Sequence, residues 1–202
     1  GTAPGVAEPA AAAFDPNGRP VDPAVRDHLI SAIDAFVGVD DGREPFRKMW
    51  VARKLADKGI LLDKAKELAT QALAQVDAAV EMERSLRDMP DADRETRRTV
   101  LTARAQDALG WVLLERRELD EAIAQLTLSV QGATADPDHP SRVWHLGVAK
   151  QEAGAEQEAL DLYMRAYDPA SPSAPIRRRI IEQLYTKIHG STDGLDQRLS
   201  RP

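Results

Sequence analysis

Apolar residues recur at intervals of three and four along most of the chain, from Ala24 to His189. The first run is typical and contains Leu29, Ile30, Ile33, Phe36 and Val37. This spacing gathers apolar side chains on one face of an α-helix. No segment alternates between polar and apolar residues for long enough to predict a sheet. The pattern therefore predicts an all-α protein.

Turn signals divide these runs into seven to eight predicted helices. Gly59 ends the second run, and Pro90 separates two long helices. Asp91 and Asp93 supply the negative charge that favours a helix N-terminus, and Gly190 suits a helix C-terminus. The predicted helices span residues 24–37, 46 to the Gly59 stop, 61–87, 91 to a turn before 119, 119–132, 141–153, 156–167 and 175–189.

Residues 1–22 differ from the rest of the chain because they are rich in Pro, Ala and Gly and have no helical period. We interpret them as an extended or disordered N-terminal tether. Residues 23–202 then form a single helical domain, a size that one core or one stacked array can reach.

A repeat links two neighbouring segments of the chain. The dipeptide Leu109-Gly110 recurs as Leu146-Gly147, which gives a period of 37 residues. Three further positions agree at the same offset: Ala122 with Ala159, Leu126 with Tyr163, and Ser129 with Ala166. Small residues at fixed positions of a helix hairpin indicate that two backbones cross closely, with larger apolar residues on either side. Such crossings are predicted at Gly110, Gly147, Ala122 and Ala159.

This pattern resembles the tetratricopeptide repeat (TPR), a helix-turn-helix unit of about 34 residues. The best-matching copy spans 140–168 and contains Leu146, Gly147, Gly154, Ala159, Tyr163 and Ala166. The copy at 91–132 is degenerate, because Arg117 replaces the turn glycine and Ser129 replaces the last alanine.

A more divergent hairpin at 46–88 has lost the Leu-Gly pair, and its turn at Gly59 is one residue longer. The predicted helix at 174–189 resembles the polar capping helix that repeat arrays need. The resemblance implies a right-handed superhelical array of antiparallel helix hairpins, whose concave face receives an extended peptide.

The resemblance also implies which residues face that groove. First-helix positions beside the Leu-Gly pair face the concave side in this family. In this chain they are Asp107, Trp111, Trp144 and Val148, bounded by Arg104, Glu115 and Gln151. Family members that hold a C-terminal carboxylate carry Lys and Asn there, so we expect a more apolar groove instead. Trp144 has a second interpretation, as a core residue in the family's usual tryptophan position, one residue out of register.

Composition and charge narrow the range of functions. The net charge is −6 and acidic and basic side chains are interleaved, which disfavours a nucleic-acid partner. The chain has no cysteine, no apolar run that predicts direct membrane insertion, and no histidine pair at metal-binding helical spacing.

The DPDHP segment at 136–140 is interpreted as a turn with an Asp helix cap. Without phosphate-binding, nucleophile-elbow or dinucleotide motifs, we expect no catalytic, cofactor or metal site.

We therefore expect a non-enzymatic scaffold that binds a protein or peptide and exists as a monomer or a weak homo-oligomer. The alternative is a structural or regulatory appendage of a larger envelope or thioredoxin-like redox assembly. Residues 188–199 favour it, because they resemble the segment that joins helical repeats to a thioredoxin-like domain in some bacterial proteins. The start at Gly1 suits a removed signal peptide and favours an extracytoplasmic, periplasmic location over a cytoplasmic one.

Overall fold

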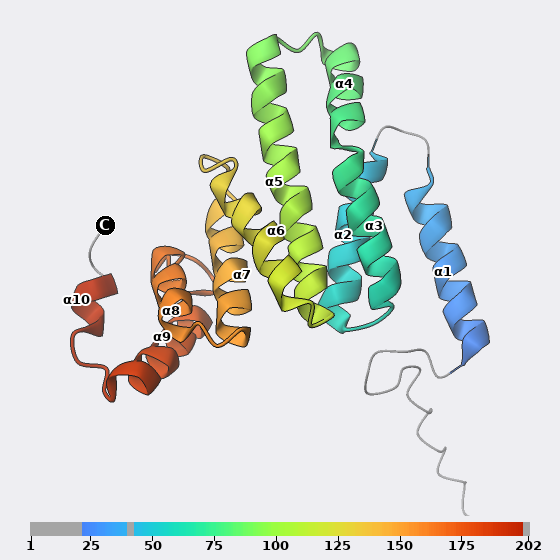
Figure 1. The fold of residues 1–202 in the computed structure, drawn as a ribbon. Helices are drawn as coiled ribbons and strands as arrows, with labels where there is room; N and C mark the ends of the chain where they lie inside the picture. The colour runs from blue at the N-terminus through green and yellow to red at the C-terminus, as the bar shows by residue number, and fades with distance from the viewer. Residues whose placement is uncertain (1–21, 40–42, 200–202) are drawn as a thin grey trace, which may run out of the picture.

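The computed structural model describes residues 22–39 and 43–199, and within these ranges the chain forms ten helices and no strand (Figure 1). This confirms the all-α prediction. The helices are α1 (Pro23–Val37), α2 (Glu44–Lys58), α3 (Leu62–Ala74), α4 (Val76–Arg87), α5 (Asp91–Glu115), α6 (Leu119–Gln131), α7 (His139–Glu152), α8 (Glu156–Arg165), α9 (Ala174–His189) and α10 (Leu195–Leu199). The predicted tether at 1–22 lies almost wholly outside the described residues.

The helix count exceeds the predicted seven to eight for two reasons. The long helix expected at 61–87 is divided into α3 and α4 at Gln75, whose backbone angles are φ −95° and ψ 0°. Lys48 Nζ donates to the Gln75 side-chain oxygen at 3.1 Å, and the Gln75 amide donates to Glu44 at 3.4 Å. These contacts tie the break to α2. The second addition is α10, a single short turn after α9.

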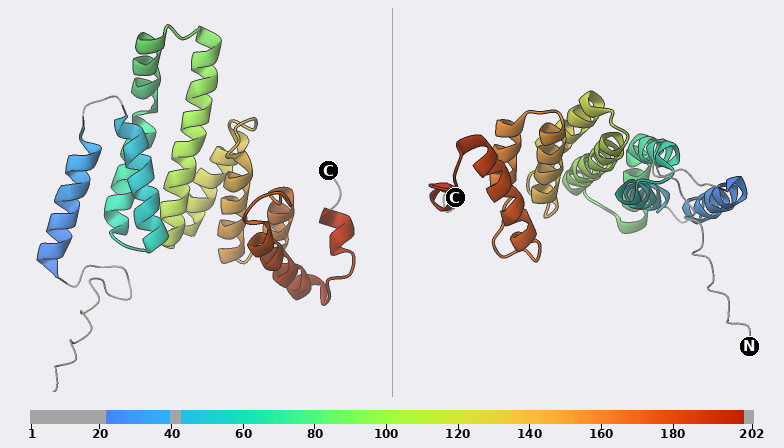
Figure 2. Two further views of the ribbon diagram at one scale, coloured as in Figure 1. Left: turned by 180° about the vertical axis from the view of Figure 1, so that it is seen from behind. Right: turned by 90° about the horizontal axis from the view of Figure 1, so that it is seen from below.

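The helices pack as a series of hairpins. α2 packs on α3, α5 on α6, and α7 on α8, and each hairpin contacts the next through α3 with α5 and α6 with α7. α9 packs against α8, and α1 against α2. Seen along the helices, the hairpins follow one another in a row between α1 at one end and α9 and α10 at the other (Figure 2, right). The first helices of successive hairpins also meet, because α2 contacts α5 and α5 contacts α7.

Two glycines lie where the helices of a hairpin cross closely. A Cβ atom at Gly110 would stand 2.6 Å from Leu126 Cγ, and one at Gly147 would stand 2.7 Å from Tyr163 Cε1. Both distances are too short for real contacts, so only glycine fits without a shift of the neighbouring side chain. The alanines predicted at the same crossings, Ala122 and Ala159, are fully buried. The close crossings predicted at the two glycines are confirmed.

The three hairpin turns share one backbone geometry. The first residue after α2 and the second residue after α5 and after α7 have a positive φ: 65° at Gly59, 65° at Arg117 and 81° at Gly154. In all three turns, the next amide donates to a carbonyl five residues back: Ile60 to Leu55, Glu118 to Leu113, and Ala155 to Lys150. This is the Schellman arrangement that ends many helices. Counted from the positive-φ residue to the start of the next helix, the first turn is one residue longer than the other two, as predicted, and Leu61 also has a positive φ there.

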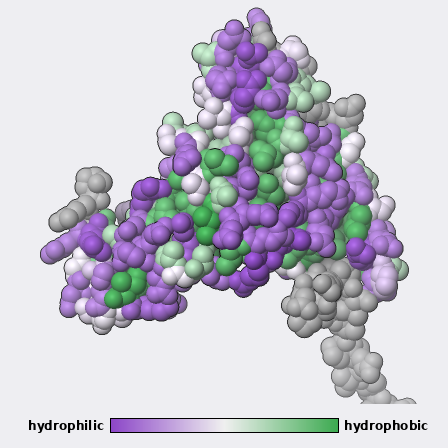
Figure 3. Space-filling model, in the orientation of Figure 1, coloured by the Kyte–Doolittle hydropathy of each residue, from purple (hydrophilic) through white to green (hydrophobic). Residues whose placement is uncertain are grey.

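Buried apolar side chains join the hairpins into a continuous core. One cluster connects α1, α2 and α3 with α5, α6 and α7, a second connects α7 to α10, and a third lies among α2, α3, α4 and α5. Most of the face turned to the viewer in Figure 3 is hydrophilic, with hydrophobic residues scattered between charged ones. α4 and the first half of α5 project beyond the other helices (Figure 1).

Candidate binding groove

A groove of about 520 Å³ lies along the first helices of the three hairpins, α2, α5 and α7. These helices face the viewer on the left of Figure 2. The lining residues are Phe46, Met49, Trp50, Arg53, Lys54 and Asp57 from α2, Arg104, Asp107 and Ala108 from α5, Asp138 from the loop before α7, and Ser141, Arg142 and His145 from α7. Arg104 and Asp107 belong to the predicted groove residues, and both reach this site.

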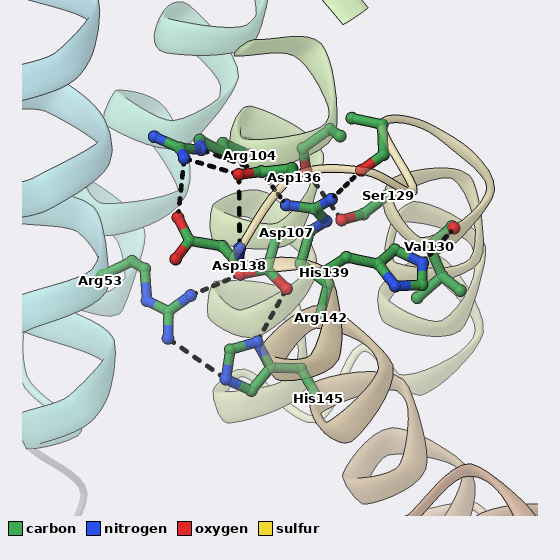
Figure 4. A network of polar contacts seen from close by, with 12 residues as sticks. Arg53, Arg104, Asp107, Ser129, Val130, Asp136, Asp138, His139, Arg142 and His145 are labelled. Carbon is green, nitrogen blue, oxygen red and sulfur yellow. Dashed lines mark hydrogen bonds and ion pairs between the residues drawn. The ribbon is translucent and has the colours of Figure 1, made fainter. Parts of the chain in front are cut away.

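A polar triad joins the three helices on the groove floor (Figure 4). Arg53 donates to Asp107 Oδ2 at 2.5 Å, and the Nδ1 atom of His145 lies 2.8 Å from Asp107 Oδ1. The third contact is weaker, with Arg53 Nη2 at 3.4 Å from His145 Nε2. Asp107 is 5% exposed, so both of its oxygens are used to hold α2 and α7 against α5.

Trp111 lies one turn beyond Asp107 on α5 and borders the triad. Its ring centroid is 4.7 Å from that of His145, and its indole N–H donates to Asp57 at 3.1 Å. The Arg53 guanidinium lies 5.8 Å from the ring centroid. Trp111 is half-buried. It therefore supports the lining side chains of α2 and α7 from the side and does not itself line the groove.

Trp144 lies in the core and not on the groove. The side chain is 9% exposed and its ring packs 4.2 Å, centroid to centroid, from that of Tyr163. The Arg177 guanidinium covers it from α9 at 4.8 Å. The second interpretation of Trp144, as a packing residue, is the one that these contacts support.

The remaining predicted groove residues lie at the far end of the first helices. Glu115 is exposed at the end of α5, and partial desolvation, with Asp57 and Glu152 nearby, raises the pKa of its carboxyl group against the opposing effect of Arg117. Val148 packs between two core clusters, and Gln151 accepts a hydrogen bond from the Tyr163 hydroxyl at 2.8 Å. Glu115, Val148 and Gln151 are not among the groove-lining residues.

The DPDHP segment forms the predicted turn, and Asp138 stands at the N-cap position of α7 without a side-chain capping hydrogen bond. The main contacts of the segment are the ionic ones of Asp136, which we call the ionic anchor. Asp136 is almost fully buried and accepts hydrogen bonds from Arg104, at 2.8 and 3.1 Å, and from Arg142 (Figure 4). Arg104 also reaches Asp138 at 3.0 Å. The hydrogen bonds from Arg104 and then Arg142 hold the pKa of Asp136 well below its usual range, although burial opposes them. This anchor holds the loop before α7 in place on the groove side. The sequence spacing of Asp136, Arg104 and Arg142 follows no pattern that would have predicted their contact.

Sequence reasoning also missed the most exposed aromatic residue of the groove. Trp50 is 57% exposed and contacts Phe36 of α1 edge-on, with ring centroids 6.0 Å apart. The spacing of residues in α2 could have identified this side chain. One side of the helix carries the groove residues Phe46, Trp50, Arg53 and Asp57. The opposite side carries the core residues Val51, Ala52, Leu55 and Ala56.

The triad does not form an arrangement for covalent chemistry. An aspartate that orients a histidine occurs in hydrolases, where the other ring nitrogen faces a nucleophile. Here the Nε2 atom of His145 faces the Arg53 guanidinium. Among the described residues, no group of three or more His, Asp or Glu side chains could hold a metal ion. The groove offers fixed hydrogen-bond donors beside an open indole ring, which is chemistry suited to binding.

In the described part of the chain, every helix is too short or too polar to cross a membrane. Comparison with protein-family models, curated proteins and solved structures gives no match to this chain.

Proposed function

We propose that this protein is a non-enzymatic, TPR-like helical array that binds a segment of a partner protein or peptide in the groove along α2, α5 and α7. Three features support the TPR-like assignment. They are the small residues at hairpin crossings, the shared Schellman turns, and the contacts between first helices of successive hairpins. In such an array the first helices line the concave face.

The observation that carries the proposal is the side-chain content of this groove. Trp50 leaves more than half of its surface open, and it stands near Arg53 and Arg104. Both arginines are held by carboxylates, so their remaining N–H groups are fixed before a partner arrives. Trp and Arg are the residues most often responsible for binding energy at protein interfaces.

The test is selection of short random peptides on the full chain, followed by affinity measurement with the selected peptides. Trp50→Ala should weaken binding about tenfold or more, because truncation of such an anchor typically costs about 2 kcal/mol. Leu128→Ala is the matched control, since Leu128 is 47% exposed on α6 and does not line the groove. Both variants should keep the melting temperature of the wild type.

Peptides that bind Trp50→Ala as tightly as wild type would show that the partner site lies elsewhere. A selection that yields no binding peptide would remove the proposal of a peptide-binding groove.

A further inference from the structure

A second, apolar pocket lies between α1 and α2 and has a volume of about 350 Å³. Its walls are formed by Leu29, Ala32, Ile33 and Phe36 from α1, by Trp50, Val51, Lys54, Leu55 and Lys58 from α2, and by Ile60. All but two of these side chains are apolar. The pocket is large enough to take one aromatic or branched aliphatic side chain.

This pocket borders the groove of α2, α5 and α7. Trp50 and Lys54 line both of them, so the exposed indole ring forms the ridge between the two hollows. Phe36 is 46% exposed on the other wall of the apolar pocket. A peptide that crosses the Trp50 ridge would therefore contact polar groups on one side and an apolar hollow on the other.

The charge at the rim of the apolar pocket has one sign. Lys54 and Lys58 stand one helical turn apart on α2, and no acidic residue is among the described residues that line the pocket. The acidic groups nearby are engaged: Asp34 pairs with Lys64 at 2.9 Å, and Asp57 accepts the Trp111 indole N–H. Lys54 lies 3.8 Å from Asp57 but keeps 58% of its side chain exposed. The rim therefore favours a negatively charged neighbour.

We propose that the partner segment is an acidic, apolar peptide. One aromatic or branched aliphatic side chain occupies the α1–α2 pocket, and an adjacent Asp or Glu faces Lys54 and Lys58. This rests on the proposed peptide-binding function and specifies the chemistry of the ligand. The two lysines supply specificity and faster association, while the pocket and Trp50 supply most of the affinity.

The deciding experiment reverses the rim charge on the full chain. Random short peptides are selected in parallel on the wild type, on Lys54→Glu/Lys58→Glu, and on Lys187→Glu. The last is a control on α9, where Lys187 is also exposed. We expect the wild type and the control to select an apolar residue beside Asp or Glu, and the double variant to select the same apolar residue beside Lys or Arg.

Affinity measurements with one selected peptide separate the contributions. Phe36→Ala should weaken binding about tenfold or more. Lys54→Gln/Lys58→Gln should weaken it roughly fivefold and reduce its sensitivity to salt, because exposed ion pairs are weak and screened.

Three outcomes would overturn the inference. Selected peptides without any charge preference would remove the role of the lysine rim. Peptides that depend on Trp50 but bind Phe36→Ala normally would leave the proposed function standing and exclude the apolar pocket. Sedimentation of the wild type as a dimer, with Phe36→Ala monomeric, would assign the pocket to a second copy of the chain.

Discussion

At the scale of single residues, Gly147 shows how closely the helices of a hairpin approach. Gly147→Leu places a branched side chain where even a Cβ atom would stand 2.7 and 2.8 Å from the Tyr163 ring. The ring must move, and Tyr163 is itself packed on Trp144. Overpacking of this kind costs about 1–3 kcal/mol or more of the free energy of unfolding. Urea unfolding measures this loss of unfolding free energy. The control is Ala124→Leu, because Ala124 lies on the exposed side of α6.

An unchanged unfolding free energy for Gly147→Leu would mean that α7 and α8 separate easily at this point. The assigned hairpin register would then lose its main packing constraint.

Arg117 carries backbone strain that its two counterparts avoid. It has a φ of 65°, in the same turn position as Gly59 and Gly154. A non-glycine residue in the left-handed region costs roughly 1 kcal/mol or more. Arg117→Gly should therefore stabilise the protein by about 0.5–1 kcal/mol, even though it removes an exposed ion pair with Glu152.

Thermal melts compare Arg117→Gly with Arg117→Ala, which also loses the ion pair but keeps the strained φ. If the two variants melt together, the positive φ carries no cost and the expectation fails.

The helix crossings and the turns could be predicted from the sequence because the backbone geometry at these positions favours particular residue types. Gly147 must be small and Gly154 must tolerate a positive φ, whatever surrounds them. The buried pair of Asp136 and Arg142 could not be predicted in this way. Their contact depends on how the loop before α7 folds back against α5, and any of the many charged residues of this chain could have filled those roles.

At the scale of elements, the loop between α6 and α7 is held by the charge of Asp136. Asp136→Asn leaves the Arg142 guanidinium, 1% exposed, facing a neutral amide. Removal of one partner of a buried ion pair costs about 3–5 kcal/mol. Urea unfolding at neutral pH should therefore show a much less stable variant. Asp138→Asn is the control, because Asp138 is exposed.

The same carboxyl group predicts a pH dependence. The pKa of Asp136 is depressed in the folded state, so its stabilisation is complete above the unfolded-state pKa of about 4. It is lost as the pH falls below that value towards the folded-state pKa. The difference in unfolding free energy between wild type and Asp136→Asn should shrink as the pH is lowered from about 5 towards 2. A constant difference over this range would contradict the assigned role of the charge.

Element boundaries followed from the sequence except where tertiary contacts decide them. α2, α6 and α9 each end at the residue directly before the glycine that marks the end of the helix. The break between α3 and α4 carries no Gly or Pro and lies at Gln75, whose side chain contacts two residues of α2. Local propensity gives no sign of such a break, because Gln favours helices.

At the scale of the whole molecule, the order of hairpins could be predicted, but the identity of the most exposed aromatic side chain of the groove could not. Stacking in series follows from the repeat, since each hairpin can bury its apolar face only on its neighbours. Which tryptophan remains exposed depends on the helices that pack beside it. Trp144 turns towards α8 and α9, whereas Trp50 lies beside α1 and stays open.

Stability should also vary along the array, because residues 81–100, which form the second half of α4 and the first half of α5, have little apolar packing. Among the described side chains from 81 to 100, none is buried. Ion pairs connect the two helices instead, with Arg94 to Glu81 at 3.1 Å and Arg97 to Glu83 at 2.8 Å. α7, by contrast, buries residues on both of its neighbours.

Hydrogen exchange followed by mass spectrometry should therefore find amides in 81–100 exchanging faster than those in α7. Raising the salt concentration should speed exchange in the projection, since exposed ion pairs are screened, and leave α7 nearly unchanged because apolar contacts are not. The two halves of α5 serve as an internal comparison, because burial on this helix begins at Leu101. Equal protection along all of α5 at both salt concentrations would show that the helix opens as one unit and that the ion pairs do not set the stability of its first half.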